Sequence, residues 1–106
     1  MPSRFAGAHV LITGGSAGLG AALAEAFVRA NANVTLVART QASLDAEADR
    51  LRRLDTRVRG VDPWVVTRAA DVTVEGAFER VLASVEEEMG PVDVLVCNAG
   101  ASTPGE

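Results

Sequence analysis

The stretch from Thr13 to Gly20, Thr-Gly-Gly-Ser-Ala-Gly-Leu-Gly, has the residue types of a phosphate-binding loop. It follows the apolar run 10–12 and precedes an alanine-rich segment, 21–27, that favours a helix. The first N–H groups of a helix lack intrahelical partners, and the helix dipole favours negative charge there. Glycine permits positive φ and lets a ligand approach the backbone. The stretch therefore predicts a site for a phosphate-bearing ligand.

The spacing of the glycines does not by itself decide whether this loop binds a dinucleotide. They stand at positions 14, 15, 18 and 20, which is not the G-x-G-x-x-G order of the commonest dinucleotide fingerprint. A tight turn with no ligand therefore stays open as an alternative. The expected strand before the loop and the expected helix after it favour the ligand site.

Arg39 follows the apolar run 34–38, which predicts a second strand. In a dinucleotide-binding fold the end of that strand reaches the adenosine ribose. An acidic residue there accepts from the 2′-hydroxyl and selects NAD, whereas an arginine pairs with a 2′-phosphate and selects NADP. The next acidic residue along the chain is Asp45. We expect Arg39 to favour NADP, with a solvated surface arginine as the alternative.

Apolar runs and helical periodicity predict the elements that position these residues. Thr67 and Arg68 interrupt the third strand, Thr73 is the expected N-cap of the third helix, and Gly90 stops that helix. Asn31 or Asn33 is expected to end the first helix in a left-handed conformation. The expected ranges are strands 8–13, 34–38, 64–70 and 92–97, and helices 18–30, 41–54 and 74–89.

Each predicted helix has an apolar face. In the first helix this face comprises Leu19, Leu23, Ala26, Phe27 and Ala30. In the second it comprises Leu44, Ala48, Leu51 and Leu54, with Glu47 on the solvated side. In the third it comprises Val74, Phe78, Val81, Leu82, Val85 and Met89.

The element order βαβαβαβ predicts an α/β fold, a Rossmann-type doubly wound parallel sheet that is truncated after its fourth strand. The expected strand order is 3-2-1-4, with ligand at the carboxyl ends of strands 1 and 4. The glycine loop and a turn at Asn98 then share one crevice. We expect residues 1–106 to form one domain.

Composition excludes several other classes of function. The net charge is −4 and the sequence pI is about 4.9, so we expect no nucleic-acid partner. The single cysteine, Cys97, excludes an internal disulfide and is expected to be a small core residue. His9 is expected at the edge of the first strand. We predict no metal site, and no apolar run approaches the ~18–20 residues of a membrane span.

Four motifs together resemble the short-chain dehydrogenase/reductase family: Thr13-Gly14-x-x-x-Gly18-x-Gly20, Ala38-Arg39, Asp71-Val72 and Asn98-Ala99-Gly100. The resemblance implies that the cofactor is NADPH/NADP. It assigns the pyrophosphate and 2′-phosphate region to Gly14, Ser16, Ala17, Gly18, Leu19 and Gly20, with Arg39. It places Asp71 and Val72 beside the adenine, and Asn98, Ala99 and Gly100 beside the ribose. Asp71 as a residue that merely precedes a helix, and Asn98 as a plain turn former, are the alternatives.

Within that family, the strings are most similar to 3-ketodihydrosphingosine reductases, which reduce a long-chain ketone with NADPH in sphingolipid synthesis. That resemblance implies a lipid ketone substrate, in a full-length form only, and the cytosolic face of the endoplasmic reticulum; otherwise we expect a cytoplasmic protein. The chain departs from the pattern at Asn31-Ala32, where the family usually has glycine, and near Ser43, where the sphingoid enzymes often have lysine. A short-chain reductase of another substrate, such as a 3-ketoacyl thioester, is an alternative.

The family's catalytic groups are a serine and a Tyr-x-x-x-Lys pair. The sequence contains no tyrosine, and all ten of its basic Lys+Arg residues are arginines. Ser102 and Thr103 follow the fourth strand too closely to be the catalytic serine. We therefore assign no catalytic residue and expect the cofactor-binding part of a reductase without its catalytic half. A truncated, non-catalytic NADP-binding module is the alternative, and an apolar fourth-strand edge predicts an oligomer.

Overall fold

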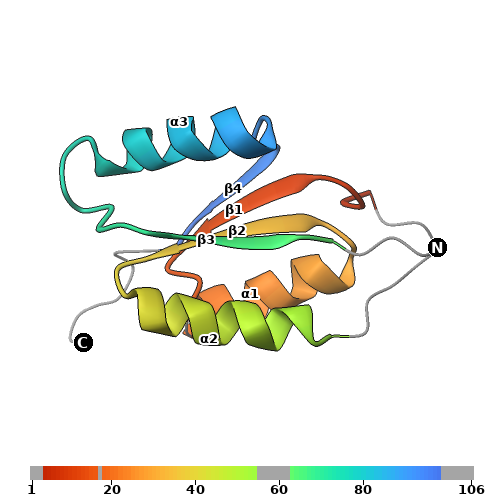
Figure 1. Ribbon diagram of the computed structural model, residues 1–106. Coiled ribbons are helices and arrows are strands. Elements are labelled where there is room, and N and C mark those ends of the chain that lie inside the picture. Colours follow the sequence, from red (N-terminus) through yellow and green to blue (C-terminus); the bar gives the residue numbers. More distant parts are fainter. Residues whose placement is uncertain (1–3, 17, 55–62, 99–106) are drawn as a thin grey trace.

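The computed structural model describes residues 4–16, 18–54 and 63–98. Its strands are β1 (His9–Thr13), β2 (Asn33–Ala38), β3 (Val65–Ala69) and β4 (Val94–Cys97). They form one parallel sheet in the order β3-β2-β1-β4 (Figure 1). The predicted fold class and strand order are thereby confirmed.

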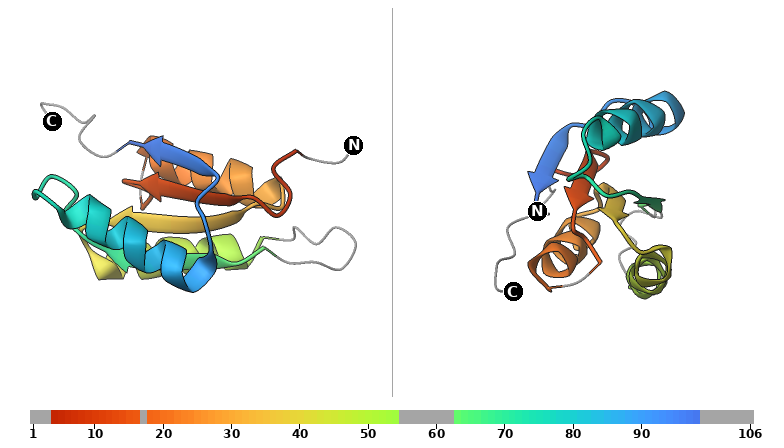
Figure 2. Two further views of the ribbon diagram at one scale, coloured as in Figure 1. Left: turned by 90° about the horizontal axis from the view of Figure 1, so that it is seen from above. Right: turned by 90° about the vertical axis from the view of Figure 1, so that its left-hand side faces the viewer.

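Three helices connect the strands: α1 (Gly18–Arg29), α2 (Gln41–Arg52) and α3 (Ala77–Met89). The end-on view in Figure 2 shows α1 and α2 on one face of the sheet and α3 on the other. Within the described residues, no helix is long and apolar enough to cross a membrane. Asn31 ends the α1 segment with φ 67°, so the first of its two predicted caps is the one used.

The main hydrophobic core lies between the sheet and the α1–α2 layer. Alternate strand residues point to this side, and a fully buried aliphatic side chain contributes about 1.5–3 kcal/mol. The core comprises Val10, Ile12, Val34, Leu36 and Val65 from the strands, with Ala24, Val28, Leu44, Ala48 and Leu51 from the helices.

The predicted apolar face of α1 is confirmed only in part, because Leu23 and Phe27 pack against the core but other predicted members do not. Leu19 is 65% exposed and Ala26 is also exposed, whereas the buried residues are Gly20, Ala24 and Val28. The close approach of Gly20 to the loop before the helix sets its rotation, so small residues face the sheet. The helical spacing of large apolar residues does not report this rotation, because the contact that sets it involves a glycine.

Glu47 was expected on the solvated side of α2, and this prediction is wrong. It is only 7% exposed, and Arg50 donates to its two carboxylate oxygens at 3.1 and 2.6 Å. Arg50 also bonds to Glu25 of α1 at 2.7 Å, and Arg29 reaches the same carboxylate at 2.9 Å. The hydrogen bond from Arg50 is the main reason that the pKa of Glu25 is lowered. This network joins α1 to α2.

Thr73 does not cap the third helix. The helix begins at Ala77, after Gly76 in the left-handed region with φ 81°. The Thr73 hydroxyl and amide instead both donate to Asp71 Oδ1, at 2.5 and 3.0 Å. Residues that favour an N-cap also favour such turns, so the pattern was ambiguous. Val74, predicted on the apolar face, lies before the helix and is 52% exposed.

On the α3 side of the sheet, His9 begins β1 as expected, whereas the expectation for Cys97 is wrong. His9 is 4% exposed, and its ring nitrogens lie 3.2 Å from the Gly90 carbonyl and 2.9 Å from Thr35 Oγ1. Because the carbonyl only accepts, Nδ1 donates to it. Cys97 is exposed rather than in the core, because it lies on the opposite face of β4 from Val94 and Val96, which pack against the main core.

Candidate functional site

The loop after β1 owes its shape to glycines and to backbone hydrogen bonds. Gly14 and Gly18 have φ of 70° and 60°, a region that disfavours other residues. The Gly14 amide donates to the Val37 carbonyl of β2 at 2.7 Å. A Cβ at Gly15 would lie 2.9 Å from Leu36 Cδ2. The loop is therefore held against β2.

Gly20 determines how closely α1 approaches this loop. A Cβ at Gly20 would lie 2.1 Å from the Gly14 carbonyl oxygen, a backbone atom that no side-chain rotation can move away. Any larger residue would push the helix away from the loop. The six-residue spacing from Gly14 to Gly20 is thus a packing requirement that sets the first turn of α1 directly against the carboxyl end of β1.

The start of α1 is accessible from solvent. Gly18 is exposed, Leu19 is 65% exposed and Ser16 is half-buried, while Ala17 lies outside the described residues. The first N–H groups of any helix have no intrahelical acceptor. An anion at this position would meet those donors and the positive end of the α1 dipole.

Asn98 connects the end of β4 to the glycine loop. Its backbone amide donates to Thr13 Oγ1 at 2.9 Å, and its side-chain Nδ2 lies 3.5 Å from the Gly14 carbonyl. The Thr13 hydroxyl lies 3.4 Å from the Val96 carbonyl. The carboxyl ends of β1 and β4 are therefore joined at the predicted crevice. Ala99 and Gly100, predicted beside the ribose, lie outside the described residues.

Arg39 and Asp71 leave the sheet from neighbouring strands. The Ala70 amide donates to the Ala38 carbonyl at 2.8 Å, which holds the two strand ends together. Arg39 is exposed, and Val72 beside Asp71 is half-buried. Hydrogen bonds from Thr73 are the main cause of the lowered pKa of Asp71, and the positive charge of Arg39 lowers it further.

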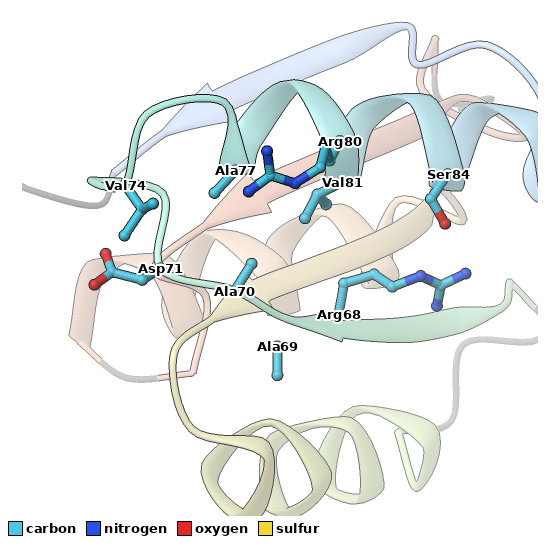
Figure 3. Close-up of a pocket in the computed structure, with 9 residues that line it drawn as sticks. All are labelled: Arg68, Ala69, Ala70, Asp71, Val74, Ala77, Arg80, Val81 and Ser84. Atoms are coloured by element: carbon cyan, nitrogen blue, oxygen red, sulfur yellow. The ribbon is translucent and has the colours of Figure 1, made fainter.

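A pocket of about 440 Å³ lies between β3 and α3, next to Asp71 (Figure 3). Its wall includes Arg68, which bonds to Glu88 of α3, and Arg80. Figure 3 shows the Asp71 carboxylate directed away from both arginines. No sequence pattern predicts this pocket, because Arg68 stands out in the sequence only as an interruption of the third expected strand.

The described site residues therefore meet at one edge of the sheet. Gly14, Arg39, Asp71 and Asn98 follow β1, β2, β3 and β4 respectively, and parallel strands have their carboxyl ends on the same side. Across the described ranges, no group of three or more His, Cys, Asp or Glu side chains is arranged to hold a metal ion. The chemistry that this edge supports is the binding of a phosphate-bearing nucleotide.

Comparison with known proteins agrees with this arrangement. The family model described as short chain dehydrogenase matches residues 8–106. The chain belongs to the short-chain dehydrogenase family. A solved structure with a similar fold is L-sorbose reductase from Gluconobacter frateurii complexed with NADPH and L-sorbose. Its TM-score is 0.84 at 32% identity, over 100% of this chain and 38% of that one.

Curated relatives in the short-chain dehydrogenase family differ in their named activities. A 3-dehydrosphinganine reductase of Arabidopsis thaliana is 42% identical over 87% of this chain and 25% of its own length. A glucose 1-dehydrogenase of Gluconobacter oxydans is 39% identical over 95% of this chain and 36% of its own length. The chain thus spans about a quarter to a third of the length of these relatives.

Proposed function

We propose that this chain is the NADPH-binding part of a short-chain reductase that reduces a ketone. The observation that carries the proposal is the contact between Gly20 and Gly14, which fixes the start of α1 at the carboxyl end of β1. Arg39 stands at the end of the neighbouring strand, where a ribose 2′-phosphate would be recognised.

The residues present fit a dinucleotide phosphate. The glycines leave room for a ligand at the backbone, and the α1 N-terminus supplies donors for the pyrophosphate. The guanidinium of Arg39 can make charge-assisted hydrogen bonds to a 2′-phosphate. When bound, NADPH supplies the hydride for a carbonyl carbon. The part of this chain is to hold and orient the nucleotide; no residue of it is assigned to proton transfer.

For the substrate we propose 3-ketodihydrosphingosine, and with it a role in sphingolipid synthesis at the cytosolic face of the endoplasmic reticulum. The support is the resemblance of the motif strings, together with the 42% identical 3-dehydrosphinganine reductase. The similarly close glucose 1-dehydrogenase and L-sorbose reductase support a wider class of carbonyl and hydroxyl substrates. A panel of ketones, including a sugar ketone and a 3-ketoacyl thioester, assayed with a form that carries the catalytic half, separates these alternatives.

A non-catalytic NADP-binding module is the second candidate function. It is favoured by one observation: the 106 residues contain neither tyrosine nor lysine. The two candidate functions predict different coding sequences after Glu106. A downstream serine followed by Tyr-x-x-x-Lys supports the reductase, and a stop codon at that point supports the module.

Binding itself tests both candidates. NADPH and NADH are titrated separately into the protein, with nucleotide fluorescence as the measurement. One charge-assisted pair with the 2′-phosphate contributes about 1.5–3 kcal/mol, so NADPH is expected to bind at least about tenfold more tightly than NADH. Equal affinity would contradict the proposed choice of cofactor, and no binding of either nucleotide would contradict the proposed function.

A further inference from the structure

Hydrogen bonds from the residues just before and just after Arg39 hold its backbone next to the end of β3. Before it, the Ala38 carbonyl accepts from the Ala70 amide at 2.8 Å. After it, Gln41 Nε2 donates to the Thr67 hydroxyl at 3.2 Å and to Asp45 at 2.8 Å. The Arg39 backbone is therefore fixed beside the segment from which Asp71 emerges.

The Asp71 carboxylate is also fixed, and among the described residues it makes no ion pair with the arginines of the pocket that Asp71 itself helps to line. Its Oδ1 atom accepts both the amide and the hydroxyl of Thr73. Figure 3 shows the carboxylate pointing away from Arg68 and Arg80. Among the described residues, no hydrogen bond falls on Asp71 Oδ2. The negative charge thus has a set position at the carboxyl edge of the sheet.

The two charges interact without forming a direct ion pair. The positive charge of Arg39 contributes to the lowered pKa of Asp71, after the hydrogen bonds from Thr73. In the described part of the chain, no salt bridge joins the two side chains. Arg39 therefore leaves the sheet beside the segment that carries Asp71, and among the described residues no salt bridge to Asp71 holds its guanidinium.

We propose that Asp71 is a specificity-determining residue whose fixed negative charge reduces the preference of Arg39 for a 2′-phosphate. This inference rests on the proposed function. A phosphate bound by Arg39 lies within the field of the Asp71 carboxylate, and like charges repel. Arg39 is exposed and Asp71 is half-buried, so water weakens the interaction between their charges and salt weakens it further. Asp71 therefore lowers the discrimination between NADP and NAD a few-fold.

The resemblance to the family places Asp71 beside the adenine, and that role can be separated from this one. Adenine is common to NADP and NAD, so the loss of an adenine contact weakens both to the same extent. Only an effect on the 2′-phosphate changes the ratio of the two affinities. The ratio is therefore the informative quantity.

The test compares Asp71→Asn with the wild-type protein, using 2′,5′-ADP and 5′-AMP as probes in calorimetric titrations. Asparagine keeps a carbonyl oxygen for Thr73 and removes the charge. We expect the preference for 2′,5′-ADP to rise about two- to fivefold at low salt, and this rise to shrink at about 0.5 M salt, where screening acts within a few ångströms. Asp49→Asn is the matched control, because Asp49 is an exposed carboxylate on α2.

A preference that stays unchanged or falls in Asp71→Asn, with both probes still bound, would overturn this inference and leave the proposed function standing. Failure of the wild-type protein to bind either probe would overturn both. A second measurement does not depend on nucleotide: in Arg39→Gln, the carbon-13 resonance of the Asp71 carboxyl should report a higher pKa than in wild type. An unchanged value would show that the two charges do not interact.

Discussion

The two faces of the sheet differ in how completely they are covered. On the α1–α2 face, Val94 and Val96 of β4 pack against the main core. On the α3 face, the residues that alternate with them are open to solvent: Leu95 is 46% exposed and Cys97 is exposed. The same strand is thus apolar on both sides but partly buried on one. The end-on view in Figure 2 shows the helices on the two faces of the sheet.

The covered face is the one that fixes the candidate site. Gly20 and the rest of α1 belong to it, so the glycine loop is attached to the larger core. The α3 face is held by α3 with its buried Val85, by the Arg68–Glu88 pair and by the polar contacts of His9. We infer that nucleotide binding depends mainly on the covered face. The exposed apolar edge of β4 is a surface that invites pairing, and an oligomer formed through it stays a prediction.

The largest expected effect tests the covered face at its closest contact. Gly20→Ala places a Cβ 2.1 Å from the Gly14 carbonyl oxygen. We expect a loss of about 3 kcal/mol or more in the free energy of unfolding, because the backbone must move. Urea unfolding measures it. Gly18→Ala is the control: a Cβ there meets nothing within 4 Å, and only its φ of 60° is unfavourable. A loss below about 1 kcal/mol at Gly20 would contradict the packing argument.

A pair of leucines compares the two faces directly. Leu44 of α2 is fully buried on the covered face, whereas Leu95 is 46% exposed on the other face. Leu44→Ala should lower the free energy of unfolding by about 2–5 kcal/mol, and Leu95→Ala by less than about 1 kcal/mol. Both values come from urea titrations under the same conditions. Similar losses for the two variants would show that the faces contribute equally.

The smallest expected effect concerns the ion pairs between α1 and α2. The pKa of Glu25 is lowered from 4.5, mainly by its hydrogen bond from Arg50. A carboxyl group with a lowered pKa in the folded state stabilises the protein above its unfolded pKa, and this stabilisation is lost as pH falls through the folded pKa. Glu25→Gln should therefore be slightly less stable than wild type at pH 7 and equal to it at strongly acidic pH. A difference that persists at acidic pH would exclude this origin.

Much of the fold could be predicted from local sequence patterns. The strand order follows from alternating strands and helices, because such chains form parallel sheets with few permitted arrangements. The rotation of α1 could not be predicted, since the contact that sets it joins two backbone segments at Gly14 and Gly20. The burial of Glu47 could not be predicted from α2 alone. Its partner Arg50 also bonds to Glu25 of α1, and this contact between helices leaves no local sequence pattern.

The candidate site was predictable to a similar extent. The motifs named the residues at the ends of all four strands, because each strand end carries a distinctive residue type. The turn at Asp71 was not foreseen, since Thr73 fits an N-cap and this turn equally well. No sequence pattern singles out Arg80, which lines the pocket between β3 and α3. Its place beside Arg68 depends on how α3 lies over β3, which no local pattern reports.

We propose that the glycine loop after β1 and Arg39 form an NADP-selective site. The most direct measurement is a fluorescence titration of Arg39→Asp with NADPH and NADH, with Arg53→Asp, at the far end of α2, as a control of equal charge change. We predict that Arg39→Asp weakens NADPH binding at least about tenfold, by loss of one charge-assisted pair, and leaves NADH binding nearly unchanged. An equal loss of affinity for both nucleotides would contradict the account.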